Sequence, residues 1–177
     1  MSIPNLSDHW SPLSHRPWLS AYADGVPAEI DPVDQTLVDL LSASVSRYPK
    51  EVALEFFGRQ TTYAELGERV ERVANGLRKQ GVVAGDRVAL VLPNCPQHVV
   101  AFYAVLRLGA IVVEHNPLYT ARELRHQFEV HGAVAAIVWD KVADTIAEMP
   151  SDVRPRTIVS VRMPDALPLG KRLALKL

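Results

Sequence analysis

The chain has 177 residues, of which 48% are hydrophobic and 22% charged, and its formal net charge is −1. This composition is typical of a soluble globular domain with its own core, and a charge near zero argues against a nucleic-acid partner. The single cysteine, Cys95, excludes an intramolecular disulfide, and no uncharged apolar run reaches the ~20 residues that span a bilayer.

Residues 1–33 are predicted to form an irregular arm, because prolines recur along them and proline fixes φ and removes a backbone donor. Aromatic and leucine side chains make the arm more apolar than a free tail: Trp10, Trp18, Leu19 and Tyr22. We therefore expect it to pack on the domain surface. The alternative is a partly ordered leader.

A helix is predicted after Asp34, a good N-cap, and it should stop at Pro49. Two short strands over 52–57 and 60–63 follow as a hairpin around Gly58-Arg59. Thr62 and Glu65 then have the spacing of a capping box, which predicts a second helix that ends at Gly81.

A regular rhythm follows that helix. Short, β-branched apolar runs begin 23 residues apart, at Val88, Ile111, Val134 and Thr157. Runs that are apolar on both faces are typical of strands buried in a parallel sheet. Helical patterns lie between them, over 97–108, 121–130 and 142–149. The fold class is therefore α/β, a mostly parallel sheet with βαβ crossovers and helices on both faces, plus the arm and the hairpin.

The order weakens after Met149, where prolines recur and the chain ends in a basic, apolar segment. We interpret residues 163–177 as a linker or helix start whose packing partner is missing. The predicted organisation is an arm over 1–33, an α/β subdomain over 34–162 and this linker.

Polar side chains stand where three predicted strands end. Asn94 and Asp140 are interpreted as helix N-caps, since caps prefer these residue types. Glu114, His115 and Asn116 follow the second of these strands, and ligands bind at this end of open α/β sheets. We call these three residues the strand-end rim. They are a candidate ligand-facing group, with His115 as a proton carrier, or else they form a turn.

Other site types lack support in the sequence. Gly81 and Gly85 precede a strand, whereas a phosphate loop follows one and opens a helix, so no phosphate cradle is predicted. His126 and His131 are about 140° apart on a helix, which does not suit a shared metal. Cys95 has no basic partner nearby and is interpreted as a buried, inert thiol. No catalytic, cofactor-binding or metal-ligating residue is assigned.

Several segments in order carry a resemblance to a known family. They are Arg16-Pro-Trp-Leu19, Gly25–Ile30, Tyr63-Ala-Glu-Leu66, Gly81–Asn94 and Leu108–Thr120. Together they resemble the N-terminal domain of the adenylate-forming, AMP-forming acyl-CoA synthetases, most of all the long-chain fatty acid–CoA ligases.

The resemblance implies a two-step ligase. ATP and a fatty acid give an acyl-adenylate and pyrophosphate, and coenzyme A then displaces AMP to form the thioester. ATP, Mg²⁺ and CoA are thus the cofactors implied for the full-length enzyme, and none should bind tightly to this chain. The resemblance also implies a cytoplasmic enzyme, with peripheral contact at the inner face of the membrane and a homodimer as further expectations.

The phosphate loop and the catalytic lysine of the family are absent from this sequence. The chain is therefore expected to be inactive alone, as the N-terminal part of such a ligase. Two alternatives stay open: a free-standing, non-catalytic α/β binding or scaffold module, and an enzyme of the same superfamily with a different acid substrate.

Overall fold

The computed structural model describes residues 16–30 and 33–174, which belong to two compact units, Met1–Asp34 and Gln35–Leu177. The described part of the first unit holds a 3₁₀ turn, η3 (Pro17–Ala21), and an ion pair between Arg16 and Glu29. Residues 1–15 of the predicted arm lie outside the described residues. That the arm packs on the domain stays a prediction.

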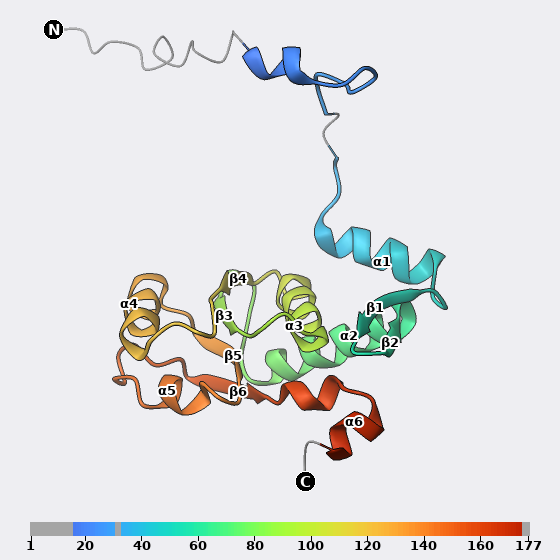
Figure 1. Ribbon diagram of the computed structural model, residues 1–177. Helices are drawn as coiled ribbons and strands as arrows, with labels where there is room; N and C mark the ends of the chain where they lie inside the picture. The colour runs from blue at the N-terminus through green and yellow to red at the C-terminus, as the bar shows by residue number, and fades with distance from the viewer. Residues whose placement is uncertain (1–15, 31–32, 175–177) are drawn as a thin grey trace, which may run out of the picture. The chain divides into compact units, whose positions relative to one another are not determined.

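The second unit alternates helices and strands (Figure 1). Its elements are α1 (Leu37–Arg47), β1 (Val52–Phe56), β2 (Arg59–Thr62), α2 (Tyr63–Lys79), β3 (Arg87–Val91), α3 (Pro96–Arg107), β4 (Ile111–Glu114), α4 (Ala121–His131), β5 (Ala135–Trp139), α5 (Ala143–Ala147), β6 (Thr157–Val161), η4 (Met163–Ala166) and α6 (Leu169–Ala174).

The strands form two sheets. β1 and β2 pair as the antiparallel hairpin, and the other four strands form a parallel sheet of order β4-β3-β5-β6. The predicted α/β class with βαβ crossovers is confirmed. The chain leaves β3 toward β4 and then returns across β3 to reach β5, so the winding reverses at β3.

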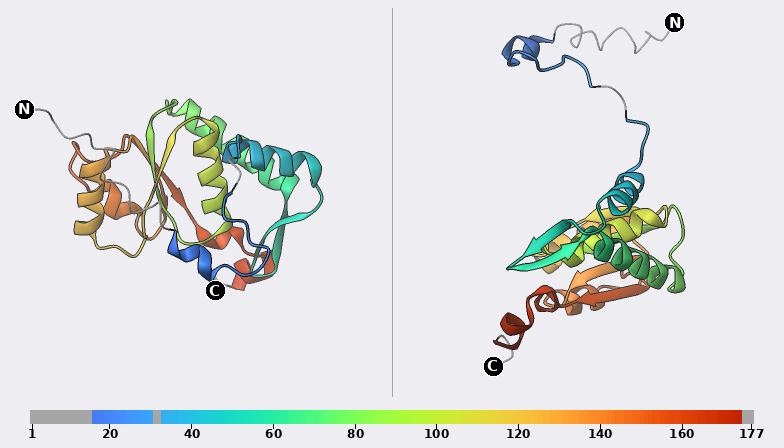
Figure 2. Two further views of the ribbon diagram at one scale, coloured as in Figure 1. Left: turned by 90° about the horizontal axis from the view of Figure 1, so that it is seen from above. Right: turned by 90° about the vertical axis from the view of Figure 1, so that its right-hand side faces the viewer.

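Alternate residues of the central strands face opposite sides of the sheet. Val88 and Leu90 of β3 pack beneath α2 and α3, whereas Ala89 and Val91 pack beneath α4 and α5. Figure 2, left view, shows these helices on the two sides of the sheet. Because both faces are covered, β3 is buried along Val88–Val91, which explains its continuous apolar sequence.

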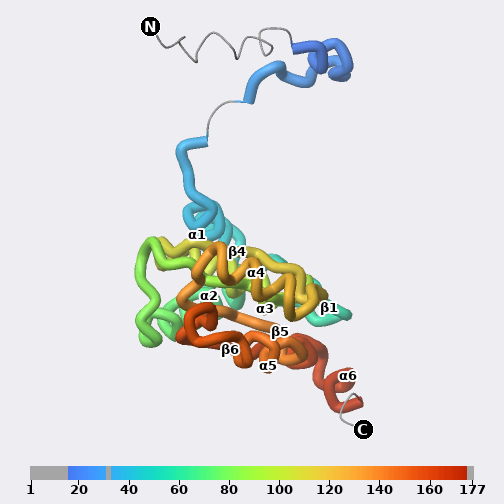
Figure 3. The backbone as a smooth tube through the Cα atoms, turned by 90° about the vertical axis from the view of Figure 1, so that its left-hand side faces the viewer, coloured from blue at the N-terminus to red at the C-terminus, as the bar shows by residue number. Residues whose placement is uncertain are grey.

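β6 is an edge strand, with β5 beside it and α5 packed on one face (Figure 3). On that face Ile158 joins the core beneath α4 and α5. On the other face Val159 keeps 38% of its surface exposed. The sheet is therefore covered unevenly, and its β6 side is open on the face that α2 and α3 share.

Capping boxes set the start of three helices. The predicted pairs Thr62/Glu65 and Thr120/Glu123 begin α2 and α4. The prediction that α1 starts after Asp34 is wrong by two residues. Thr36 is the cap, and its box partner Asp39 accepts from the Thr36 backbone N–H at 2.9 Å. Since the box satisfies two orphan backbone donors, it outcompetes a lone aspartate.

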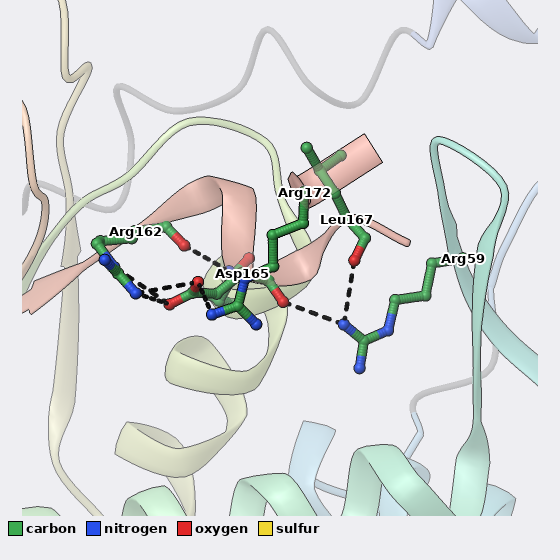
Figure 4. Close-up of polar contacts among 6 residues, drawn as sticks. Arg59, Arg162, Asp165, Leu167 and Arg172 are labelled. Carbon is green, nitrogen blue, oxygen red and sulfur yellow. Dashed lines mark hydrogen bonds and ion pairs between the residues drawn. The ribbon is translucent and has the colours of Figure 1, made fainter. Parts of the chain in front are cut away.

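Residues 163–174, interpreted from the sequence as part of a linker or helix start, form η4 and α6 and are bonded to the β1–β2 hairpin. Arg59 of β2 donates to the carbonyls of Asp165 and Leu167, at 3.0 and 3.5 Å (Figure 4). Asp165 pairs in turn with Arg172 at 2.8 Å, and Lys171 donates to the Phe57 carbonyl at 2.9 Å. These bonds therefore fix η4 and α6 against the hairpin.

Candidate functional site

The candidate site lies at the carboxyl ends of β3, β4 and β5, where the winding of the sheet reverses. Open α/β sheets bind ligands at such switch points. A pocket of about 410 Å³ is found here, which we call the strand-end pocket. Its lining comes from three places: residues 92–94 and His98 after β3, residues 114–118 after β4, and Trp139 at the end of β5.

Glu114 joins β4 to the crossover helix α3. Both of its carboxylate oxygens lie within hydrogen-bond distance of His98 Nε2, at 2.9 and 3.0 Å. The side chains are 45% and 23% exposed, so solvent screens the pair and its net contribution to stability is at most about 1 kcal/mol. Both residues of the pair line the strand-end pocket.

His115 is buried, with 8% of its surface exposed. Its Nδ1 lies 2.5 Å from Gln127 Oε1 on α4, so Nδ1–H is the donor, and the ring stacks on Phe128 with centroids 5.2 Å apart. Burial lowers the pKa of His115. The imidazole is therefore neutral at pH 7, with an unprotonated Nε2 that has no hydrogen-bond partner among the described residues.

His131 completes the cluster behind His115. Its ring centroid lies 4.9 Å from that of His115 and 4.8 Å from that of Phe128. The Ala133 backbone N–H donates to His131 Nδ1 at 3.0 Å, so the proton of the neutral ring is on Nε2. Burial, then the charges of His115 and Arg87, lower the pKa of His131 to about 4.

Asn116 forms a turn. Its Oδ1 accepts from the Leu118 backbone N–H at 3.0 Å, which is an Asx turn before α4. The structure thus brings the whole strand-end rim to the pocket but gives each member a different partner: Glu114 contacts α3, His115 contacts α4, and Asn116 contacts its own loop. A ligand-facing role for the rim stays a proposal.

The predictions that Asn94 and Asp140 cap helices are wrong. The N-cap of α3 is Cys95 and that of α5 is Val142, and neither uses a side-chain bond. Pro96 stands at the first turn of α3, where it needs no N–H partner and already has a helical φ. Asn94 instead lines the strand-end pocket. Cys95 is buried as predicted, and burial raises its thiol pKa, which disfavours the reactive thiolate.

Sequence reasoning missed Gln127, Phe128 and His131 as neighbours of the rim. Their spacing on α4 indicated only a helix face, and His131 was compared with His126 on the same helix. The contact that matters crosses from α4 to the end of β4, which no single-helix periodicity reveals. Within 16–30 and 33–174, no three His, Cys, Asp or Glu side chains are grouped so as to hold a metal ion.

Replacing Thr120 tests the turn that carries the rim into α4. Thr120 Oγ1 accepts from the Glu123 backbone N–H at 3.3 Å, and Glu123 Oε2 accepts from the Thr120 N–H at 2.8 Å. We expect Thr120→Ala to lower the free energy of unfolding by about 1 kcal/mol, measured by urea denaturation. Thr120→Ser keeps the hydroxyl and should stay near wild type. Equal losses in both variants would contradict the capping role.

The sequence matches the AMP-binding enzyme family over residues 41–174, three quarters of its length. The chain belongs to the AMP-binding enzyme family. It is 40% identical to the long-chain-fatty-acid–CoA ligase of Escherichia coli O6:H1 over 156 residues, and 34% identical to that of Bacillus subtilis over 160 residues. These alignments cover 87% and 90% of this chain but only 28% and 29% of the relatives.

Solved structures show the same fold. A Mycobacterium tuberculosis fatty acyl CoA synthetase superposes with a TM-score of 0.61 at 26% identity, over 76% of this chain and 27% of that one. An anthranilate CoA ligase with bound anthranoyl-AMP gives 0.68 at 23% identity, over 82% of this chain and 28% of that one. The parallel sheet and its helices are therefore a shared part of larger enzymes.

Proposed function

We propose that this chain supplies the N-terminal α/β part of a long-chain fatty acid–CoA ligase. The observation that carries the proposal is the 40% identity over 156 residues to a ligase of that name. The proposed reaction of the longer enzyme has two steps. A fatty acid and ATP give an acyl-adenylate and pyrophosphate, and CoA then gives the thioester and AMP.

The described residues do not fit the phosphates of ATP. A phosphate site needs free backbone N–H groups in a loop that follows a strand. The loops after β3 and β4 carry Pro93 and Pro117, which have no N–H, and no glycine follows β3, β4 or β5 before the next helix. The first turn of α4 is closed by the Glu123 carboxylate. No step of the reaction is therefore assigned to residues of this chain.

The part that these residues play is to build the framework. The sheet fixes the carboxyl ends of β3, β4 and β5 beside one another, and the Glu114–His98 and His115–Gln127 contacts tie those ends to α3 and α4. We propose that the strand-end rim faces a ligand or a neighbouring part of the longer enzyme. Mg²⁺ use, a cytoplasmic location with peripheral membrane contact, and a homodimer belong to the same proposal. Among the described helices, none is both long and apolar enough to cross a bilayer.

The activity test uses two proteins. The 177-residue chain alone should show no fatty-acid-dependent ATP–pyrophosphate exchange, because residues 16–30 and 33–174 form no phosphate cradle. A fusion of this chain to the non-matching remainder of the Escherichia coli ligase should form long-chain acyl-CoA. Exchange by the pure chain alone, or a folded fusion without acyl-CoA synthesis, would contradict the proposal.

A different acid substrate is the second candidate. A 3-oxocholest-4-en-26-oate–CoA ligase of Rhodococcus rhodochrous is 36% identical over 126 residues, which cover 71% of this chain and 23% of that protein. A second fusion, of this chain to the non-matching part of the Rhodococcus rhodochrous ligase, distinguishes a steroid acid from a fatty acid as the substrate. Activity in this fusion only, with none in the Escherichia coli fusion, would favour the steroid acid.

A further inference from the structure

A groove of about 860 Å³ runs over the side of the sheet that α2 and α3 share, and we call it the sheet groove. Its floor is apolar and consists of Ile137, Val159 and Val161 of β5 and β6. Side chains of α2 and α3 also line it, together with Arg59 and Asp165 of the network in Figure 4. It does not share a lining residue with the strand-end pocket.

The winding of the sheet explains why no crossover helix fills this groove. The connections from β4 to β5 and from β5 to β6 run in the same direction along the sheet. Since parallel crossovers are right-handed, both α4 and α5 fall on one face. Among the helices within residues 35–174, α2 and α3 cover the opposite face, and β6 lies at the edge of the sheet. Buried parallel sheets carry helices on both faces. We therefore expect a further helix to cover this face at β6, where Val159 is exposed.

Two glycines on α2 indicate how close that helix comes. A Cβ on Gly67 would lie 3.1 Å from Val45 of α1, so this glycine is explained by the close approach of α1. Gly76 lines the sheet groove, and a Cβ there would meet nothing within 4 Å. The two glycines are nine residues apart, hence about 180° apart around the helix.

Gly76 therefore costs stability without a reason among the described residues. A glycine inside a helix costs about 1 kcal/mol relative to alanine. On the opposite face of the same helix, the equivalent cost accompanies the packing of α1 against Gly67. Close packing would explain Gly76 in the same way, if a further element packs on the groove face with its backbone close to that of α2.

The groove wall also carries charges that lack partners. Glu68, Arg69 and Arg72 lie on this face of α2. No ion pair or side-chain hydrogen bond joins them to any residue of 16–30 or 33–174. Charges of both signs beside an apolar floor suit an amphipathic helix with an apolar stripe and flanking charges of both signs, rather than a lipid or a polyanion.

We propose that the sheet groove is the docking site of an amphipathic helix from the part of the longer ligase that this chain does not contain. More than two thirds of the length of the curated relatives lies outside the matched region, which supplies the chain for such a helix. The inference rests on the proposed function, because it takes its occupant from the same longer protein.

Thiol accessibility tests the docking. Arg72→Cys places a thiol in the groove and leaves Gly76 unchanged, and Lys79→Cys places a matched thiol on the same helix outside the groove. Cys95 is buried and gives a low background. Both variants are made in the 177-residue chain and in the Escherichia coli fusion, and their reaction with a maleimide is timed. We expect the thiol introduced by Arg72→Cys to react at least about tenfold more slowly in the fusion, whereas the Lys79→Cys thiol reacts equally in both.

Equal reactivity of the Arg72→Cys thiol in the two proteins would overturn the docking proposal. So would protection in the chain alone that grows with protein concentration, which would make a second copy the occupant. Acyl-CoA synthesis is measured on the same fusion. An active fusion with an unprotected thiol would refute the docking proposal and support the proposed function. An inactive fusion with a protected thiol would support the docking proposal and contradict the proposed function.

Discussion

Phe128→Ala is expected to lower the free energy of unfolding by about 3–5 kcal/mol, the range for truncating a buried phenylalanine. Phe128 is fully buried on α4, in the core with Val91 and Ile146. Its ring also stacks on His115 and contacts His131. Truncation therefore leaves a cavity and removes the aromatic support of both imidazoles.

Urea denaturation of purified variants provides the measurement. Val130→Ala is the matched control, since Val130 lies on the same helix and is 76% exposed. It should change the free energy of unfolding by less than about 0.5 kcal/mol. Phe128→Leu keeps an apolar side chain and should fall between the two. A loss below about 1 kcal/mol in Phe128→Ala would show that α4 is not held by this core.

Acidification from about pH 7.5 to about pH 5 is expected to destabilise the protein through His131 and His115. Both have a lowered pKa in the fold, His131 at about 4 against 6.5 for the free side chain. Between those values the unfolded chain binds more protons than the folded one, so stability is full above pH 6.5 and falls as the pH drops toward 4. The groups that face the pair are Glu114, Gln127 and Arg87.

The expected loss at pH 5 is about 1–2 kcal/mol, after a discount for the partial solvent access of His131. Denaturation midpoints at about pH 7.5, 6 and 5 measure it. His131→Gln should make the denaturation midpoint much less dependent on pH. His126→Gln should leave it intact, because His126 is an exposed histidine of the same helix. An unchanged pH profile in His131→Gln would refute the role of the buried pair.

Local signals predicted the elements well. The spacing of Thr62 with Glu65, and of Thr120 with Glu123, placed two helix starts because a capping box needs only neighbouring residues. Strands buried on both faces were recognisable by their continuous apolar runs. The predictions for Asn94 and Asp140 failed, since an asparagine or aspartate before a helix is not always its cap. Helix α3 begins at Pro96 without a side-chain bond from its N-cap.

The sequence predicted that Glu114, His115 and Asn116 follow a strand of the sheet, but it did not predict their contacts. Strand order decides which loops meet, and nothing local in the sequence states that β3 lies between β4 and β5. The partners of Glu114 and His115 lie 16 and 12 residues away on two different helices. The sheet groove was likewise out of reach, because it arises from the handedness of crossovers and not from any motif.

The bonds from Arg59 and Lys171 join residues more than 100 positions apart in the chain. During translation the hairpin emerges from the ribosome long before its partners, so the Phe57 carbonyl and the Arg59 guanidinium remain hydrated until η4 and α6 have been made. Contacts of such separation slow folding, because a long loop must close before they form. In the nascent polypeptide, the contacts between the hairpin and α6 can therefore form only after β6 has been made.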